Sequence, residues 1–231
     1  MQEQTAIDPA SEAKDTRKRL LIVDDHALFR RGVATLLEDK PEVMVCGEAD
    51  NALSALESMR RLVPDVALVD ISLPGTNGIE LTKQMLAEMP KLAIIILSMH
   101  EESIYALRAL RAGAKGYVMK AEAQTKVLDA LRKVIKGGVY LSPEFGERLI
   151  FRAIQVLDND TGSPLGKLSD REIEVLQMLG KGLSTREVAT ALHLSIKTIE
   201  THRSHIKEKL GLKDASELVR FAIEWVTQQQ G

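Results

Sequence analysis

The chain has 231 residues, of which 45% are hydrophobic and 28% charged, and its 31 Lys and Arg nearly balance its 33 Asp and Glu. The formal net charge of −2 excludes a polycation that binds nucleic acid through overall charge, so any such affinity must come from local placement. The longest apolar run, LAIIIL, is too short to span a membrane, and the acidic N-terminus lacks the pattern of a secretory signal. We therefore expect a cytoplasmic protein with no membrane partner, long enough for two domains.

Residues 1–16 are polar and aperiodic, which predicts a disordered lead-in. Over residues 17–138, short apolar runs alternate with amphipathic stretches, the pattern of successive βαβ units. The runs are apolar throughout, which favours strands buried on both faces of a parallel sheet. The expected strands are 20–24, 43–48, 66–70, 92–98 and 116–119, and the expected helices are 27–38, 51–62, 77–88, 102–112 and 122–136. The sequence therefore predicts a doubly wound α/β domain with a five-stranded parallel sheet.

Residues 139–166 are expected to form a linker, in which SPEFGERLIFRAIQVL can form one helix and DNDTGSPLG is rich in loop-forming residues. Residues 167–231 show no strand pattern and form a second, all-α domain with four predicted helices, at 170–180, 184–192, 195–209 and 214–227. The residues at the expected N-cap positions are Ser169, Ser184, Ser195 and Asp214. Three of the four have a Glu three positions later, the pattern of a capping box.

Polar side chains stand at the carboxyl ends of four of the apolar runs: Asp24, Asp25, Asp70, Ser98 and Lys120. In an open parallel sheet these ends meet at one edge, where ligands bind. Three converging carboxylates would repel one another without a divalent cation, and hard oxygen ligands suit Mg²⁺. A single aspartate at a strand end is more often a turn or cap residue. The five residues together favour a site for phosphate.

Each residue of this set has a physical role at such a site. The acidic pair and Asp70, with a backbone carbonyl near Ser72, would hold Mg²⁺. The metal would offset the charge that builds as a phosphoryl group moves onto the Asp70 carboxylate, which acts as nucleophile. Lys120 would bind one phosphoryl oxygen, and Ser98 would donate a hydrogen bond to another.

The segments LLIVDDHALFRRGVATLL, PDVALVDISLPGTNGIEL, IIILSMHEE and GAKGYVMKAE resemble the receiver domain of bacterial two-component response regulators. The resemblance implies a flavodoxin-like fold, a phospho-acceptor at Asp70, a switch hydroxyl at Ser98 and the family's lysine at Lys120. It also implies that Tyr117 is a switch aromatic, which turns inward when Ser98 moves toward the phosphate, although an aromatic on a strand is usually a core residue. A sensor histidine kinase is implied as the phosphoryl donor.

The segment LSDREIEVLQMLGKGLSTREVATALHLSIKTIETHRSHIKEKLGLKDASELVRFAI resembles the LuxR-type helix-turn-helix domain, and its combination with a receiver is that of the NarL/FixJ subfamily. Such a domain places a polar helix in the major groove of double-stranded DNA; a merely solvated helix face is the alternative. Glu200 and Glu208 would face phosphates at a cost, and Glu200 would either accept a hydrogen bond from a cytosine amino group or orient its neighbours. The residues expected to contact DNA are Lys181, Ser184, Ser195, Lys197, Thr198, Glu200, Thr201, Arg203, Ser204 and Lys207.

The last expected helix carries more apolar surface than a small helical core can bury, which predicts a homodimer on activation. A monomer with the same helix packed inward is the alternative. The residues expected at the dimer contact are Leu218, Val219, Ala222, Ile223 and Val226.

Together these features predict a phosphorylation-activated transcriptional regulator that binds promoter DNA. An enzyme that turns over an aspartyl phosphate is an alternative, but a hydrolase of the haloacid-dehalogenase type would need a second carboxylate two residues after Asp70, where Ser72 stands. A binding module that acts without phosphate is a further alternative.

Overall fold

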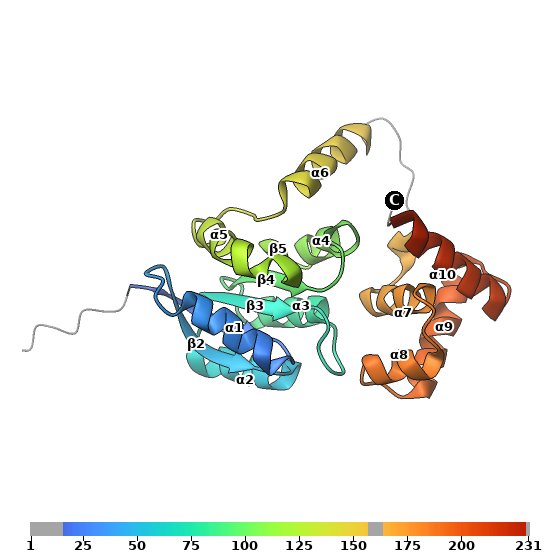
Figure 1. The fold of residues 1–231 in the computed structure, drawn as a ribbon, viewed down its shortest axis with the longest axis horizontal. Helices are drawn as coiled ribbons and strands as arrows, with labels where there is room; N and C mark the ends of the chain where they lie inside the picture. The colour runs from blue at the N-terminus through green and yellow to red at the C-terminus, as the bar shows by residue number, and fades with distance from the viewer. Residues whose placement is uncertain (1–15, 157–163, 230–231) are drawn as a thin grey trace, which may run out of the picture.

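The apolar runs of the N-terminal half form a five-stranded parallel sheet in the structure, a computed structural model that describes residues 16–156 and 164–229 (Figure 1). The strands are β1 (Lys18–Val23), β2 (Val43–Ala49), β3 (Val66–Asp70), β4 (Ala93–Ser98) and β5 (Gly116–Met119). Each lies within two residues of its predicted range, and their order is β2-β1-β3-β4-β5. The predicted sheet is confirmed. The lead-in expected over 1–16 lies, apart from its last residue, outside the described residues.

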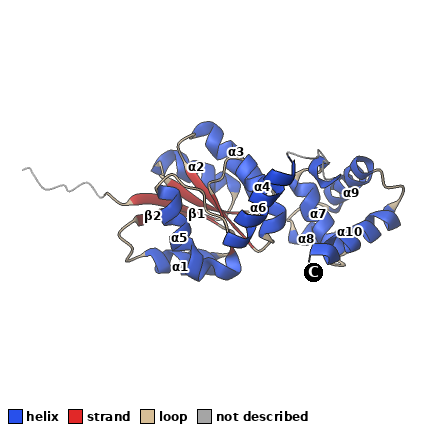
Figure 2. Ribbon diagram, turned by 90° about the horizontal axis from the view of Figure 1, so that it is seen from above, coloured by secondary structure: helices blue, strands red, loops and turns tan. Residues whose placement is uncertain are grey.

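Five helices cover the two faces of the sheet (Figure 2). One face carries α1 (Ala27–Leu37) and α5 (Ala123–Ile135), and the other carries α2 (Ala52–Leu62), α3 (Gly78–Glu88) and α4 (Glu102–Arg111). Successive strand residues point to opposite faces. Leu20 and Ile22 therefore join the core under α1 and α5, whereas Leu21 and Val23 join the core under α2, α3 and α4. Helices on both faces explain why the strands are apolar throughout.

The C-terminal half is helical, as predicted, and begins after α6 (Pro143–Val156), which lies inside the expected linker. Its helices are α7 (Asp170–Gly180), α8 (Thr185–Ala191), α9 (Ile196–Leu210) and α10 (Ala215–Gln229), each within two residues of its predicted range. The four expected N-caps form: Ser169, Ser184, Ser195 and Asp214 each accept a hydrogen bond from a backbone N–H of the first turn. Each such cap stabilises its helix by about 1 kcal/mol.

Two short 3₁₀ helices were not predicted from the sequence: η1 (Lys120–Glu122), directly after β5, and η2 (Pro164–Lys167), at the end of the expected linker. The first has a consequence for function, because it turns the chain at Lys120 and leaves that side chain at the carboxyl edge of the sheet. Among the described residues, no helix is both long enough and apolar enough to cross a lipid bilayer.

The two domains are in contact through α7, which lies between the sheet domain and α9 in both views (Figures 1 and 2). Buried residues of α7, such as Ile173 and Leu176, belong to the same contiguous apolar cluster as Tyr105 of α4. On its other side α7 packs closely on α10, since a Cβ at Gly180 would overlap the carbonyl oxygen of Ala222. The helix is thus held by both domains at once.

Candidate functional site

The sheet order reverses between β1 and β3, because β2 lies on one side of β1 and β3 on the other. At such a switch point the loops after the two strands separate and leave a crevice at their carboxyl ends. Asp24 and Asp25 follow β1 into this crevice, and Asp70 ends β3. The turn that follows brings Gly78 so close to β3 that a Cβ there would overlap the Asp70 carbonyl oxygen, so a glycine is needed at this position.

Lys120 reaches across the crevice from the end of β5 and contacts two buried carboxylates. Its Nζ lies 2.6 Å from Asp70 Oδ2 and 2.7 Å from Asp24 Oδ2. The Phe29 ring covers the ammonium, with its centroid 4.9 Å from Nζ. Buried charges are tolerated when they are paired in this way. One cation therefore serves two carboxylates, which leaves a local excess of negative charge.

The carboxylates form a cluster that could hold a divalent cation. One oxygen from each of Asp24, Asp25 and Asp70 and one ring nitrogen of His26 all lie within 4.8 Å of one another. Asp24 and Asp70 are buried, whereas Asp25 is partly exposed, and Asp70 Oδ1 is buried without a hydrogen-bond partner. An unpartnered buried oxygen beside two further carboxylates fits the preference of Mg²⁺ for hard oxygen ligands.

The pKa of Asp70 indicates that Lys120 does not fully neutralise the carboxylates of the crevice. Burial raises the pKa of Asp70 to about 6, the nearby Asp24 adds to the increase, and Lys120 opposes it. A bare carboxylate in this crevice is therefore costly to ionise. An additional cation next to Asp70 would favour the ionised form of this carboxyl group.

Three of the predicted residues meet at a residue that the sequence analysis did not identify, His100. The His100 backbone N–H donates to Ser98 Oγ at 2.9 Å, and the Tyr117 hydroxyl donates to the His100 carbonyl oxygen at 2.9 Å. Ser72 Oγ lies 3.1 Å from His100 Nε2. The Tyr117 side chain already points inward and is 1% exposed. His100 thus links the ends of β3, β4 and β5.

The same histidine approaches the second domain. Its ring packs against Tyr105, with centroids 4.9 Å apart, and the Tyr105 hydroxyl donates to Gln177 Oε1 of α7 at 3.3 Å. Burial lowers the pKa of His100 to about 4, and the positive charge of Lys181 lowers it further. The ring is therefore neutral at pH 7. A chain of contacts runs from Ser98 to α7.

A second polar contact joins the domains beside the first. Asn77, the N-cap of α3, donates to Glu174 Oε1 at 2.6 Å, and Arg171 donates to Glu174 Oε2 at 2.6 Å. Burial raises the pKa of Glu174 to about 7, although Arg171 opposes the increase. Arg108 of α4 forms an ion pair with Asp170 at 2.9 Å.

Several of the residues expected to contact DNA are engaged inside the helical domain. Ser184 and Ser195 cap α8 and α9, and Thr198 Oγ1 lies 2.8 Å from Ser195 Oγ. Arg203 donates to Thr185 Oγ1 and so ties α9 to the start of α8. These contacts fix the angle between the two helices.

The other expected DNA residues lie on the surface. Lys197, Glu200, Thr201 and Ser204 of α9 are exposed, and Lys207 is partly exposed. The helix lies beyond α7 as seen from the sheet domain (Figure 1). Lys181, by contrast, is exposed at the end of α7 that approaches His100. The structure therefore brings four polar residues and Lys207 together on α9 and leaves Lys181 nearer the domain boundary.

Only part of the expected dimer face of α10 is exposed in the structure. Leu218 and Ala222 are fully buried in the core of their own domain, and Val226 packs beside Gly180. Ile223 is 46% exposed, and Val219 is partly exposed beside it. Leu218 and Ala222 are thus unavailable for a dimer contact, because they are buried within their own domain. Helical periodicity indicates one apolar stripe on α10, but it does not indicate which residues of that stripe are buried within the domain.

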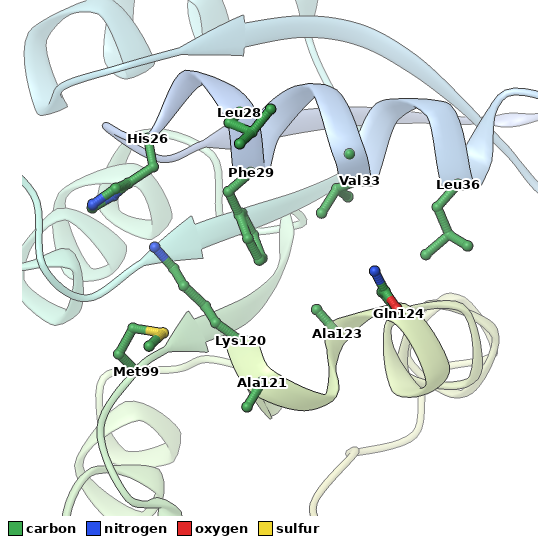
Figure 3. Close-up of a pocket in the computed structure, with 11 residues that line it drawn as sticks. His26, Leu28, Phe29, Val33, Leu36, Met99, Lys120, Ala121, Ala123 and Gln124 are labelled. Carbon is green, nitrogen blue, oxygen red and sulfur yellow. The ribbon is translucent and has the colours of Figure 1, made fainter.

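A groove of about 750 Å³ runs between α1 and α5 and ends at Lys120 (Figure 3). Phe29 and Val33 line it from α1, and Ala123 and Gln124 line it from α5. Two exposed apolar side chains flank the end near the acidic cluster, Leu28 (86% exposed) and Met99 (70%). The crevice that holds Lys120 and the acidic cluster therefore continues into an apolar groove that is open to solvent.

Comparison with known families agrees with the two halves of the chain. Residues 20–132 match the response regulator receiver domain, and residues 166–222 match the luxR family of bacterial regulatory proteins. The chain is 33% identical over 210 residues to the oxygen regulatory protein NreC of Staphylococcus carnosus, covering 89% of this chain and 97% of that protein. It is 32% identical to the transcriptional regulatory protein DegU of Brevibacillus brevis, covering 93% and 98%.

Solved structures show the same likeness. The RcsB response regulator of Salmonella typhimurium is 28% identical, with a TM-score of 0.63 over 90% of this chain and 98% of that one. A complex of RcsB with DNA matches with 29% identity and a TM-score of 0.54, over 89% of this chain and 98% of that one.

Proposed function

Because this chain belongs to the response regulators that join a receiver domain to a LuxR-type DNA-binding domain, we propose that phosphorylation of Asp70 controls its binding to promoter DNA. The observation that carries the proposal is the crevice at the switch point. There the Asp70 carboxylate has a lysine 2.6 Å from one oxygen, while the other oxygen is buried without a hydrogen-bond partner next to the acidic pair.

The chemistry at Asp70 is a phosphoryl transfer. One Asp70 oxygen attacks phosphorus, a P–O bond forms, and the bond from phosphorus to the donor nitrogen of a kinase histidine breaks, with that nitrogen keeping the electron pair. Asp24, Asp25 and Asp70 would hold Mg²⁺, with the backbone carbonyl of Ser72 as a further ligand; the metal supplies charge neutralisation. Lys120 holds a phosphoryl oxygen and Ser98 donates to another. Self-catalysed phosphorylation and hydrolysis at this site are the extent of its enzymatic activity.

The groove between α1 and α5 is the docking site for the kinase domain that carries the phosphohistidine (Figure 3). The groove leads directly to Lys120, so a helix seated there brings a donor side chain to the crevice. Leu28 and Met99 offer exposed apolar contacts at its mouth. Exposed apolar patches beside a reaction centre are typical of protein interaction sites.

The phosphorylation site is coupled to DNA binding through His100. When the Ser98 hydroxyl turns to a phosphoryl oxygen, it moves away from the His100 backbone N–H that it accepts from at 2.9 Å. His100 is then held less firmly. Its carbonyl oxygen accepts from Tyr117 and its ring packs on Tyr105, and both contacts weaken as a result. Because Tyr105 holds Gln177 of α7, the DNA-binding domain is released. Such a change biases a packing element that has two states.

Released domains bind DNA as a pair in the cytoplasm. The exposed residues of α9 enter the major groove, and α10 pairs with its copy through Val219 and Ile223. Two domains that bind adjacent half-sites gain affinity through effective concentration. Pairing suits a domain in which 10 Lys and Arg face 9 Asp and Glu, since a single copy has little electrostatic attraction to DNA.

The test is DNA affinity with and without acetyl phosphate. Wild-type affinity for a promoter fragment should rise by about 10-fold or more with the phosphodonor, within the usual range of allosteric coupling. Asp70→Asn should show no rise, whereas Asp129→Asn, an exposed aspartate of α5, should behave as the wild type. A rise in the Asp70→Asn protein would show that the acceptor is another residue.

A further inference from the structure

Glu200 lies in the second turn of α9, on the surface that the proposed function places in the major groove. The side chain is exposed, and within the described part of the chain its carboxylate has no hydrogen-bond or ion-pair partner. Arg203, one turn further along, donates to Thr185 Oγ1 instead. The free domain therefore presents an uncompensated negative charge where DNA must approach.

A carboxylate in this position weakens binding to DNA in general. It stands among Lys197, Thr201 and Ser204, which can bind phosphates or bases, but the carboxylate can only accept hydrogen bonds. Repulsion from the phosphate backbone is independent of sequence. This loss of DNA affinity is offset only where a base edge offers a hydrogen-bond donor to the carboxylate.

Base edges in the major groove differ in what they offer to an acceptor. Guanine presents two acceptors, thymine an acceptor and a methyl group, and adenine one donor beside one acceptor. Cytosine presents its N4 amino donor and no acceptor. A side chain that can only accept hydrogen bonds is therefore satisfied by cytosine without an opposing acceptor on the same base.

We propose that Glu200 is a specificity-determining residue that accepts a hydrogen bond from a cytosine N4 amino group in each half-site. This inference rests on the proposed function, because it assumes that α9 reads the major groove. The position fits the role, since residues in the N-terminal part of a recognition helix contact base edges. Guanine and thymine at the same position meet the carboxylate with an acceptor and are rejected.

The chain offers a matched control in Glu208. This residue is also an exposed glutamate on α9, and within the described residues its side chain has no partner. It lies more than two turns further along, near the end of the helix, away from the N-terminal part that reads bases. Removing its charge changes the general electrostatics of the helix without changing base recognition.

The experiment selects binding sites from a randomised DNA library with the full chain in acetyl phosphate and Mg²⁺, and compares wild type, Glu200→Ala, Glu200→Gln and Glu208→Gln. At one base position of each half-site, wild type should select cytosine over guanine or thymine by about 10-fold. Glu200→Ala should lose the preference at that position and keep the preferences at the other positions of the half-site. Glu200→Gln should shift the preference at that position to adenine, since glutamine pairs with the N6 and N7 atoms of adenine. Glu208→Gln should leave the preference at every position unchanged and bind all sites more tightly.

Two outcomes overturn the inference in different ways. If wild type selects a motif that Glu200→Ala leaves intact, the assignment to Glu200 is wrong and the proposed function stands. If wild type selects no motif with or without acetyl phosphate, promoter recognition itself fails, and the role of Glu200 fails with it. Folding is not at issue, because the substituted side chain is exposed and has no partner to lose.

Discussion

Lys120 sets the charge balance of the acceptor crevice. Its single ammonium contacts Asp24 and Asp70 within 2.7 Å, whereas the nearest nitrogen to Asp25 is that of the exposed His26 ring, 2.6 Å from Asp25 Oδ1. Three carboxylates with one lysine carry an excess of negative charge, which burial makes more costly. This imbalance is the residue-level reason to expect Mg²⁺ binding, and a metal bound here would contribute to stability as well as to the proposed chemistry.

Mg²⁺ should therefore stabilise the folded chain. At about ten times its dissociation constant it should raise the melting temperature by roughly 3 to 6 °C, because it binds the folded state alone. In Asp25→Asn, which removes one ligand without disturbing the buried lysine contacts, the shift should be much smaller. Differential scanning calorimetry with Mg²⁺ and with EDTA measures both. An equal shift in Asp25→Asn would show that the metal binds elsewhere.

The helix α7 is the element on which both domains depend. It packs on α10 through Gly180, and it meets the receiver through Glu174 and Gln177. Burial of Glu174 raises its pKa from an ordinary value of 4.5 to about 7. The folded chain consequently keeps a proton on Glu174 over a range of pH in which the unfolded chain has lost it.

Stability should fall as the pH rises through this range. A group whose pKa is raised by folding favours the folded state at low pH, and the advantage is lost between pH 4.5 and about 7. The loss is on the order of 3 kcal/mol at most. Glu174→Gln should flatten the decline, whereas Glu208→Gln should not. Urea unfolding between pH 5 and pH 8 measures the slopes, and equal slopes in all three proteins would contradict the role of Glu174.

The helix α10 carries the proposed dimer contact on its remaining exposed apolar residues. Ile223→Ser should leave the fold intact, because the side chain is 46% exposed, and should lower affinity for two adjacent half-sites by about 10-fold through lost pairing. Affinity for a single half-site should not change. Gln228→Ser, an exposed change on the same helix, is the control. Fluorescence anisotropy with DNA of one and two half-sites measures the difference, and an equal loss on both DNAs would argue against a dimer face.

In the whole molecule, α7 lies between the sheet domain, which carries the proposed phosphorylation site, and α9, the proposed DNA-reading helix. The receiver therefore holds the DNA-binding domain by α7 and leaves the outer face of α9 uncovered. If α9 reads DNA as proposed, we expect phosphorylation to act on the orientation of the two domains, because the outer residues of α9 are already exposed. The polar contacts that hold α7 stand beside an apolar one, so we expect the removal of a single polar contact to weaken the restraint on α7 without abolishing it.

Tyr105→Phe removes the hydroxyl that donates to Gln177 and keeps the ring that packs on His100. DNA affinity of the unphosphorylated protein should rise about 5-fold or more, toward that of the phosphorylated wild type, since less contact energy restrains the domain. Labelling of Asp70 by radioactive acetyl phosphate should be unchanged. Tyr140→Phe is the control, because Tyr140 lies beside Gly116, the first residue of β5. Unchanged basal affinity in Tyr105→Phe would show that coupling does not pass through this contact.

The sequence by itself determined the strands and α-helices of this protein and the grouping of acidic residues with Lys120 at one edge of the sheet. Strands and helices follow from local periodicity and capping residues, as the capping boxes at Ser169 and Ser184 illustrate. The residues at strand ends could be grouped because parallel strands share one carboxyl edge, which brought Asp24, Asp70 and Lys120 together.

Only the tertiary structure decided how the two domains meet. Asn77 and Glu174 are 97 positions apart, and nothing in the local pattern of either residue indicates the other. The local sequence around His100 likewise does not indicate that this residue contacts Ser72, Ser98 and Tyr117. The physical reason is that periodicity records whether a side chain is buried, whereas the partner that buries it depends on the surface that the rest of the chain brings against it.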